Sequence, residues 1–134
     1  MQLETGLKGI LTHRVVDSDL ATNWRNDVPV LATPVLLWLS ELACMDAIDG
    51  CTSDDEMTVG FKHEMSHLAP TPKDWLVQIS AELVEVDGKL LTFDVVANDG
   101  EECILRGRHT RAIIAKRPFV DRVEAKARAM SMAS

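Results

Sequence analysis

Cysteine is scarce in this chain and lacks the arrangement typical of a disulfide scaffold. The 134 residues contain three cysteines, Cys44, Cys51 and Cys103, an odd number without a C-x-x-C pair. Small secreted domains that depend on disulfides have a much higher cysteine density. The cysteines therefore favour a reducing compartment, and we expect a cytoplasmic protein.

Basic residues are also few compared with acidic ones. The chain has 14 Lys and Arg residues against 21 Asp and Glu residues, a net charge of −7. Five basic and two acidic residues lie within 116–134, so this end carries +3 and the rest of the chain −10. The overall balance argues against a surface that neutralises nucleic-acid phosphates. We interpret the basic end as a solvated helix face rather than a site for an anionic ligand.

Long apolar runs and cofactor motifs are missing too. The longest apolar stretch, around Val35 to Leu39, is far below the ~20 residues that span a bilayer. The N-terminus lacks the basic start and apolar run of a signal peptide. We find no G-x-G-x-x-G motif, no P-loop and no G-x-S-x-G elbow. We therefore expect no membrane partner, no cofactor, no redox or phosphoryl-transfer chemistry and no serine α/β-hydrolase.

The residues that are present indicate one globular domain over residues 1–134. Hydrophobic residues make up 46% and charged residues 26%, values typical of a chain with a packed core. Alternating or strand-favouring residues predict strands, and residues 17–32, which show no sustained period, predict a connecting segment. The expected strands are 8–16, 57–68, 75–86, 89–97 and 103–115, and an amphipathic helix is expected over 118–130.

A buried helix is predicted to begin at Thr33-Pro34. The Thr hydroxyl is suited to capping a helix, and Pro is tolerated at the first helical position. The residues that follow, up to Ile48, are apolar on nearly every side, and Gly50 supplies a stop. One such helix with short strand connections predicts an α+β fold with an antiparallel sheet. Because a single sheet cannot cover this helix all round, we expect a homodimer.

The string His63-Glu64-Met65-Ser66-His67 matches the H-E-x-x-H pattern of zinc metalloproteases. That chemistry needs a helix, where residues four apart can bind one Zn²⁺. The local alternation predicts a strand instead, and there the two histidines would lie ~13 Å apart at ~3.3 Å per residue. We therefore interpret the match as chance and assign no metal site.

Three residues are candidates for chemistry. Glu41 lies in the middle of the apolar helix, where a carboxylate is costly unless it is paired. Thr33, eight residues earlier, lies about 80° away around the helix and ~12 Å along it, so a ligand could lie between the two. Thr33 also sits where helix N–H groups can stabilise an oxyanion. His67 can exchange protons near neutral pH. Taken singly, Glu41 and His67 are each explained better as structural residues.

Read together, these residues resemble the hot-dog-fold thioesterases, and in particular the fluoroacetyl-CoA thioesterase family. The resemblance covers most of the chain and keeps spacing as well as identity. It rests on Val-Leu-Ala-Thr at 30–33, Glu41, Ala43-Cys44, Gly60, Ser66-His67, Ala69, Pro72, Ala81-Glu82-Leu83, Val86-Asp87-Gly88, Ala97, Asp99-Gly100, Gly107, His109 and Arg111-Ala112.

The resemblance implies a long central helix wrapped by a five-stranded antiparallel sheet, a homodimer, and hydrolysis of a small acyl-CoA thioester to a carboxylic acid and CoA. It implies that Thr33, Glu41 and His67 are catalytic and that Gly60 and Arg111 contact substrate. Residues 17–32 contain no Phe, whereas the family's lid does. Whether Thr33, Glu41 or water attacks stays open, as do two other functions: a non-catalytic acyl-thioester binding module and a hot-dog hydratase or dehydratase.

Overall fold

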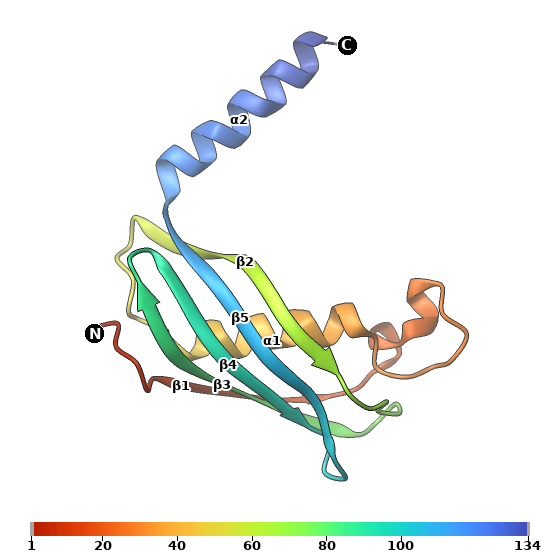
Figure 1. Ribbon diagram of the computed structural model, residues 1–134. Coiled ribbons are helices and arrows are strands. Elements are labelled where there is room, and N and C mark those ends of the chain that lie inside the picture. The colour runs from red at the N-terminus through yellow and green to blue at the C-terminus, as the bar shows by residue number, and fades with distance from the viewer. Residues whose placement is uncertain (1, 134) are drawn as a thin grey trace.

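A curved antiparallel sheet wraps around one helix in the computed structural model, which describes residues 2–133 (Figure 1). The sheet has the order β1-β3-β4-β5-β2, and each neighbouring pair is antiparallel. The elements are β1 (Lys8–Arg14), α1 (Thr33–Ala47), β2 (Glu56–His67), β3 (Leu76–Asp87), β4 (Leu90–Asn98), β5 (Cys103–Ala115) and α2 (Lys116–Ala133). The α+β prediction is confirmed, and each predicted helix and strand is present.

The order of the strands in the sheet is the main feature that the sequence did not supply. Strand β2 precedes β3 in the chain but pairs with β5 at the far edge of the sheet, while β3 pairs with β1. Residues 68–75 therefore run from β2, at one edge of the sheet, to β3, the second strand from the opposite edge. This crossover leaves β2 with an unpaired outer edge among the described residues.

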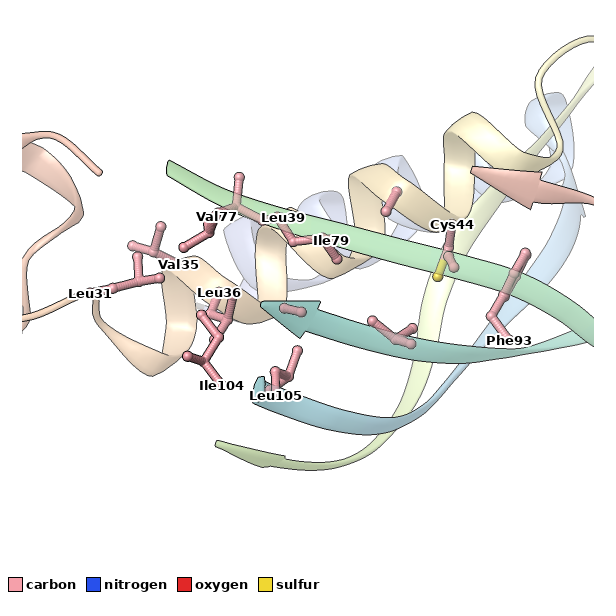
Figure 2. Packing of buried hydrophobic residues seen from close by; sticks show 14 of the residues in the cluster. Leu31, Val35, Leu36, Leu39, Cys44, Val77, Ile79, Phe93, Ile104 and Leu105 are labelled. Carbon is pink, nitrogen blue, oxygen red and sulfur yellow. The ribbon is translucent and has the colours of Figure 1, made fainter. Parts of the chain in front are cut away.

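Helix α1 lies across the concave face of the sheet and forms the core with it. Figure 2 shows Val35, Leu36 and Leu39 facing side chains from the strands. A Cβ added at Gly9 would collide with the backbone of Ala43 and Ala47, so β1 passes directly against the helix. The opposite side of α1 carries two exposed apolar residues, Trp38 at 52% and Met45 at 44%.

The start of α1 corrects one prediction. The N-cap residue is Ala32, whose extended backbone leads into Thr33 as the first helical residue. The Thr33 side chain therefore does not cap the helix. Because the cap position is held by the Ala32 backbone, which donates to the Asp19 carbonyl and accepts from Leu36, the Thr33 hydroxyl is free for another contact.

The predicted connecting segment, 17–32, folds over the start of α1. It contains two short 3-10 helices, Asp17–Asp19 and Ala21–Trp24. Its two ends are held together by a bridge between Leu20 and Leu31. The Leu31 N–H donates to the Thr71 carbonyl, which ties the segment to the loop after β2. The segment thus forms one wall beside the helix N-terminus.

Helix α2 is longer than the predicted 118–130 and begins directly after β5. It extends away from the sheet (Figure 1), and its charged and apolar side chains up to residue 130, including Phe119, Val123 and Met130, are exposed in this chain. None of the helices within residues 2–133 combines the length and the apolar character that crossing a bilayer requires.

Candidate active site

Thr33 and His67 come together at the N-terminus of α1. Their Oγ1 and Nδ1 atoms are 2.7 Å apart, a short hydrogen bond between residues 34 positions apart in the chain. Thr33 is the first residue of α1 and His67 is the last residue of β2. The geometry lets the hydroxyl donate a proton to the ring, which is the contact that an activated hydroxyl requires.

This pair lines a pocket of about 270 Å³. One wall is the segment that folds over α1, and the other is the loop that follows β2. The lining residues are Ala21, Asn26, Val30, Leu31, Thr33, His67, Leu68, Ala69 and Pro70. Six of these residues are apolar and three are polar, namely Asn26, Thr33 and His67, a composition typical of a site for a small ligand.

The other ring nitrogen of His67 is available for chemistry. Nε2 is buried and makes no hydrogen bond among the described residues. Burial lowers the pKa of His67 below the usual histidine value, and the backbone of Ala69 opposes that shift. His67 is therefore neutral near pH 7, the form that can accept a proton from Thr33.

Glu41, on α1, lies in a second cluster of polar side chains, beside the middle of β2. Its Oε1 accepts a hydrogen bond of 2.8 Å from Nη1 of Arg111. The Arg111 side chain is 4% exposed and also donates to the hydroxyl and the carbonyl of Thr58. A buried guanidinium fixed by two residues holds the carboxylate in one place and compensates its charge.

Gly60 leaves the space that this carboxylate occupies. A Cβ added at Gly60 would lie 2.6 Å from Oε1 of Glu41, closer than carbon and oxygen can approach. Gly60 also precedes a shift in the β2–β5 register between Gly60 and Lys62. A glycine at this point therefore lets Glu41 reach the sheet.

Two histidines complete the Glu41 cluster. His63 Nε2 lies 3.5 Å from Glu41 Oε2, and His109 Nε2 lies 3.7 Å from Oε1. The rings of the two histidines stack with centroids 4.1 Å apart. His109 is fully buried, its Nδ1 lies 3.0 Å from the Lys62 carbonyl, and Arg111 lies 3.1 Å from its Nε2. Burial, followed by the neighbouring His63, lowers the pKa of His109 to about 4.

The same residues are also candidate ligands of a metal ion, since ligand atoms of Glu41, His63 and His109 lie within 4.8 Å of one another. Two features oppose it. The stacked rings are only 21° from parallel, so their nitrogen lone pairs do not converge on one point. Arg111 already donates to Glu41 and places a fixed positive charge beside His109. The arrangement fits a hydrogen-bonded carboxylate better than a metal centre.

Cys44 lies near the same cluster but is not a nucleophile there. Burial raises the pKa of its thiol to about 12, Arg111 acts in the opposite direction, and Glu41 adds to the rise. A thiol with so high a pKa stays protonated at neutral pH, and the thiolate is the reactive form.

The structure thus groups the predicted residues in two places. It brings Thr33 to His67 and Glu41 to Gly60 and Arg111, but it does not bring Glu41 to His67 within one chain. Arg111, which the resemblance implied as a substrate contact, is buried against Glu41.

The sequence assigns no role to the two histidines around Glu41. His109 appears there only among the residues that carry the resemblance. His63 appears only within the H-E-x-x-H match, and it does lie in a strand. It pairs across β2 and β5 with His109. Finding the pair from sequence would have required the strand register, which no local pattern provides.

A model of the fluoroacetyl-CoA-specific thioesterase family matches residues 15–117. The chain belongs to this family. Membership assigns it to the thioester hydrolases. A curated fluoroacetyl-CoA thioesterase from Streptantibioticus cattleyicolor is 35% identical over 97 residues, which are 72% of this chain and 70% of that protein.

Solved structures agree with the family assignment. The fluoroacetyl-CoA thioesterase FlK superposes with a TM-score of 0.89 at 27% identity, over 94% of this thioesterase and 98% of that chain. A variant of FlK has been solved in complex with fluoroacetate and CoA. A hot-dog-like protein from Thermanaerovibrio acidaminovorans, at 20% identity, matches 92% of this chain and 93% of its own with a TM-score of 0.85. The predicted hot-dog fold is confirmed.

Proposed function

We propose that this thioesterase hydrolyses small acyl-CoA thioesters to a carboxylic acid and CoA, with Thr33, Glu41 and His67 as its catalytic residues. The observation that carries the proposal is the 2.7 Å contact between the Thr33 hydroxyl and His67 inside a small pocket. The CoA-bound FlK variant supports a CoA ester as the substrate class.

In this proposal the Thr33 and His67 pair acts on the thioester carbonyl. The hydroxyl orients or attacks the carbonyl carbon, and His67 takes up its proton and returns it to the departing CoA thiolate. The first turn of α1 adds the Val35 N–H, which has no helical acceptor because the first N–H groups of a helix lack a carbonyl one turn earlier. Such donors stabilise the oxyanion that develops at the carbonyl.

Glu41 is either the general base that activates a water molecule or the nucleophile that attacks the carbonyl carbon itself. Arg111 donates a hydrogen bond to Glu41, so we infer that Arg111 contributes to turnover mainly by holding Glu41 in place. Gly60, which we keep as a residue of the substrate site, leaves the space in which the Glu41 carboxylate lies and so places Glu41 where an acyl group can meet it.

A second copy of the chain completes the site in this proposal. Within one chain the two groups are separated by eight residues of α1, about 12 Å along the helix axis. The outer edge of β2 offers unpaired backbone groups, and Phe61 on this strand is 62% exposed. If two copies pair through β2, centred near Phe61, Glu41 beside Gly60 lies at the boundary between them. The same contact covers the exposed side of α1.

The proposed location is the cytoplasm. The support is that Cys44, Cys51 and Cys103 are all free, as expected in a reducing compartment.

The test is a thiol-release assay on short, medium and aromatic acyl-CoAs, including fluoroacetyl-CoA. We expect release from at least one small acyl-CoA, its loss in His67→Ala, and no effect of a chelator. The Glu101→Gln variant, which changes an exposed loop residue, is the matched control. No release from any thioester would favour a binding module, and an altered double bond in an intact thioester would indicate a hydratase.

A further inference from the structure

Glu41 presents two oxygens in different surroundings. Oε1 is held by Arg111 at 2.8 Å and faces buried His109. Oε2 has His63 as its neighbour, at 3.5 Å. The Glu41 side chain is 30% exposed and that of His63 27% exposed, so solvent reaches both. Oε2 is therefore the oxygen that is free to meet water or substrate.

His63 and His109 are stacked but differ in what they can do. His109 has 0% of its side chain exposed, and both ring nitrogens have partners, the Lys62 carbonyl and Arg111. Its lowered pKa keeps it neutral across the physiological range. His63 is exposed enough to exchange protons with solvent. Histidine is the side chain that commonly changes charge between pH 5 and 8.

The charged and titratable groups that face His63 come from two packed elements. Glu41 is on α1, and His109 and Arg111 are on β5. On β2 itself, Lys62 and Glu64 pair with each other at 3.1 Å. Glu41 is the acidic group among them that lies within ion-pair distance of the His63 ring.

We propose that His63 is a positioning residue that sets the charge and direction of the reactive oxygen of Glu41. The neutral ring directs an N–H toward Oε2 and leaves the carboxylate its charge. The protonated ring forms an ion pair with Oε2 and so makes Glu41 a weaker base. This inference rests on the proposed function, in which Glu41 is the base of the hydrolysis.

The stacking on His109 supports this role. Because His109 is anchored at both nitrogens, its ring is a fixed platform that keeps His63 beside Glu41. The register that pairs His63 with His109 across β2 and β5 sets the same position from the backbone. The ring stacking and the backbone register thus hold His63 in the same place.

The test is the pH dependence of kcat and KM in four variants. His63→Gln keeps an N–H donor without the charge change, and His63→Lys keeps a positive charge at every pH in the range. Glu64→Gln, on the same strand with a side chain 65% exposed, is the matched control. Glu41→Gln tests the proposed role of Glu41 in the hydrolysis, independently of the role of His63.

Between pH 8 and 5.5 we expect wild-type kcat to fall about tenfold more than kcat of His63→Gln, because a nearby cation weakens a base. His63→Lys should be about tenfold slower than wild type already at pH 8, with KM within about twofold. Glu64→Gln should follow the wild-type profile. Glu41→Gln should lose at least about 100-fold of the activity at every pH.

The possible failures are distinguishable. If Glu41→Gln is inactive but His63→Gln keeps the wild-type pH profile, the role of His63 is wrong and the proposed function stands. If Glu41→Gln is fully active, the role of Glu41 is wrong. Inhibition by Zn²⁺ that His63→Gln relieves would mean a metal site and would overturn the inference.

A second readout does not depend on how the His63 variants fold. In NMR spectra at pH 8, the ring signals of His63 should differ between the wild type and Glu41→Gln, because Oε2 of Glu41 lies 3.5 Å from Nε2 of His63. Identical His63 ring signals with and without the Glu41 carboxylate would contradict the proposal.

Discussion

At the scale of single residues, the role of Thr33 follows from where its hydroxyl points. The hydroxyl meets His67 and takes no part in capping α1. We expect Thr33→Ala to lower kcat by at least about 100-fold. Because Thr33 is exposed, the free energy of unfolding should change by less than about 0.5 kcal/mol.

Thr33→Ser is the matched variant, since it keeps a hydroxyl at the same position. It should retain most of the activity in the thiol-release assay. Wild-type turnover in Thr33→Ala would exclude a chemical role for this residue. A large loss of stability, measured by urea unfolding, would mean that the side chain supports the helix after all.

His109 should make the stability of the fold depend on pH. Its pKa in the folded chain is about 4, compared with the ordinary 6.5. As pH falls from 6.5 to 4, the unfolded chain binds a proton at this ring and the folded chain does not, so stability decreases. The full difference is about 3 kcal/mol at most. Stability above pH 6.5 should not depend on this group.

The measurement is urea unfolding at several pH values for the wild type and His109→Gln. The variant is expected to be less stable at neutral pH, because it disturbs a buried ring, but its stability should fall less steeply between pH 6.5 and 4. Equal slopes for the two proteins would show that His109 does not titrate as proposed.

At the scale of elements, the approach of β1 to α1 depends on the absence of a side chain at Gly9. A Cβ there would overlap the helix backbone at Ala43 and Ala47, and backbone cannot rotate away as a side chain can. We expect Gly9→Ala to destabilise the fold by about 1–3 kcal/mol, the usual cost of overpacking.

Urea unfolding checks this prediction, with Thr12→Ala on the exposed side of the same strand as the control. The control should stay close to the wild type. If Gly9→Ala is as stable as Thr12→Ala, β1 and α1 have more room between them than the structure indicates.

At the scale of the whole molecule, the two edges of the sheet should behave differently. Phe61 lies on the β2 edge and Ile10 on the β1 edge, with exposed fractions of 62% and 59%. The proposed dimer uses only the β2 edge. Phe61→Asp should therefore shift the protein toward the monomer and lower its specific activity at low concentration, because burying a charge in an interface is costly.

Ile10→Asp is the matched control and should stay dimeric and active. Sedimentation velocity over a range of concentrations measures both variants. A wild-type monomer with full activity would rule out a site shared by two chains. Dissociation by Ile10→Asp instead of Phe61→Asp would move the interface to the other edge.

The sequence by itself determined the types of element and their approximate ends. Alternation of apolar and polar residues predicted the strands, and Thr33-Pro34 before an apolar run predicted the start of α1. These patterns are local, because they arise from the backbone periodicity of each element. The resemblance added the thioesterase family and the candidate residues.

Only the tertiary structure decided how these residues meet. The placement of β2 beside β5 stacks His63 on His109, and the crossover after β2 brings His67 to Thr33. These contacts join positions 34 or more residues apart, and no periodicity within one element encodes them. They depend on strand order and register, which the packing of the whole sheet around α1 selects.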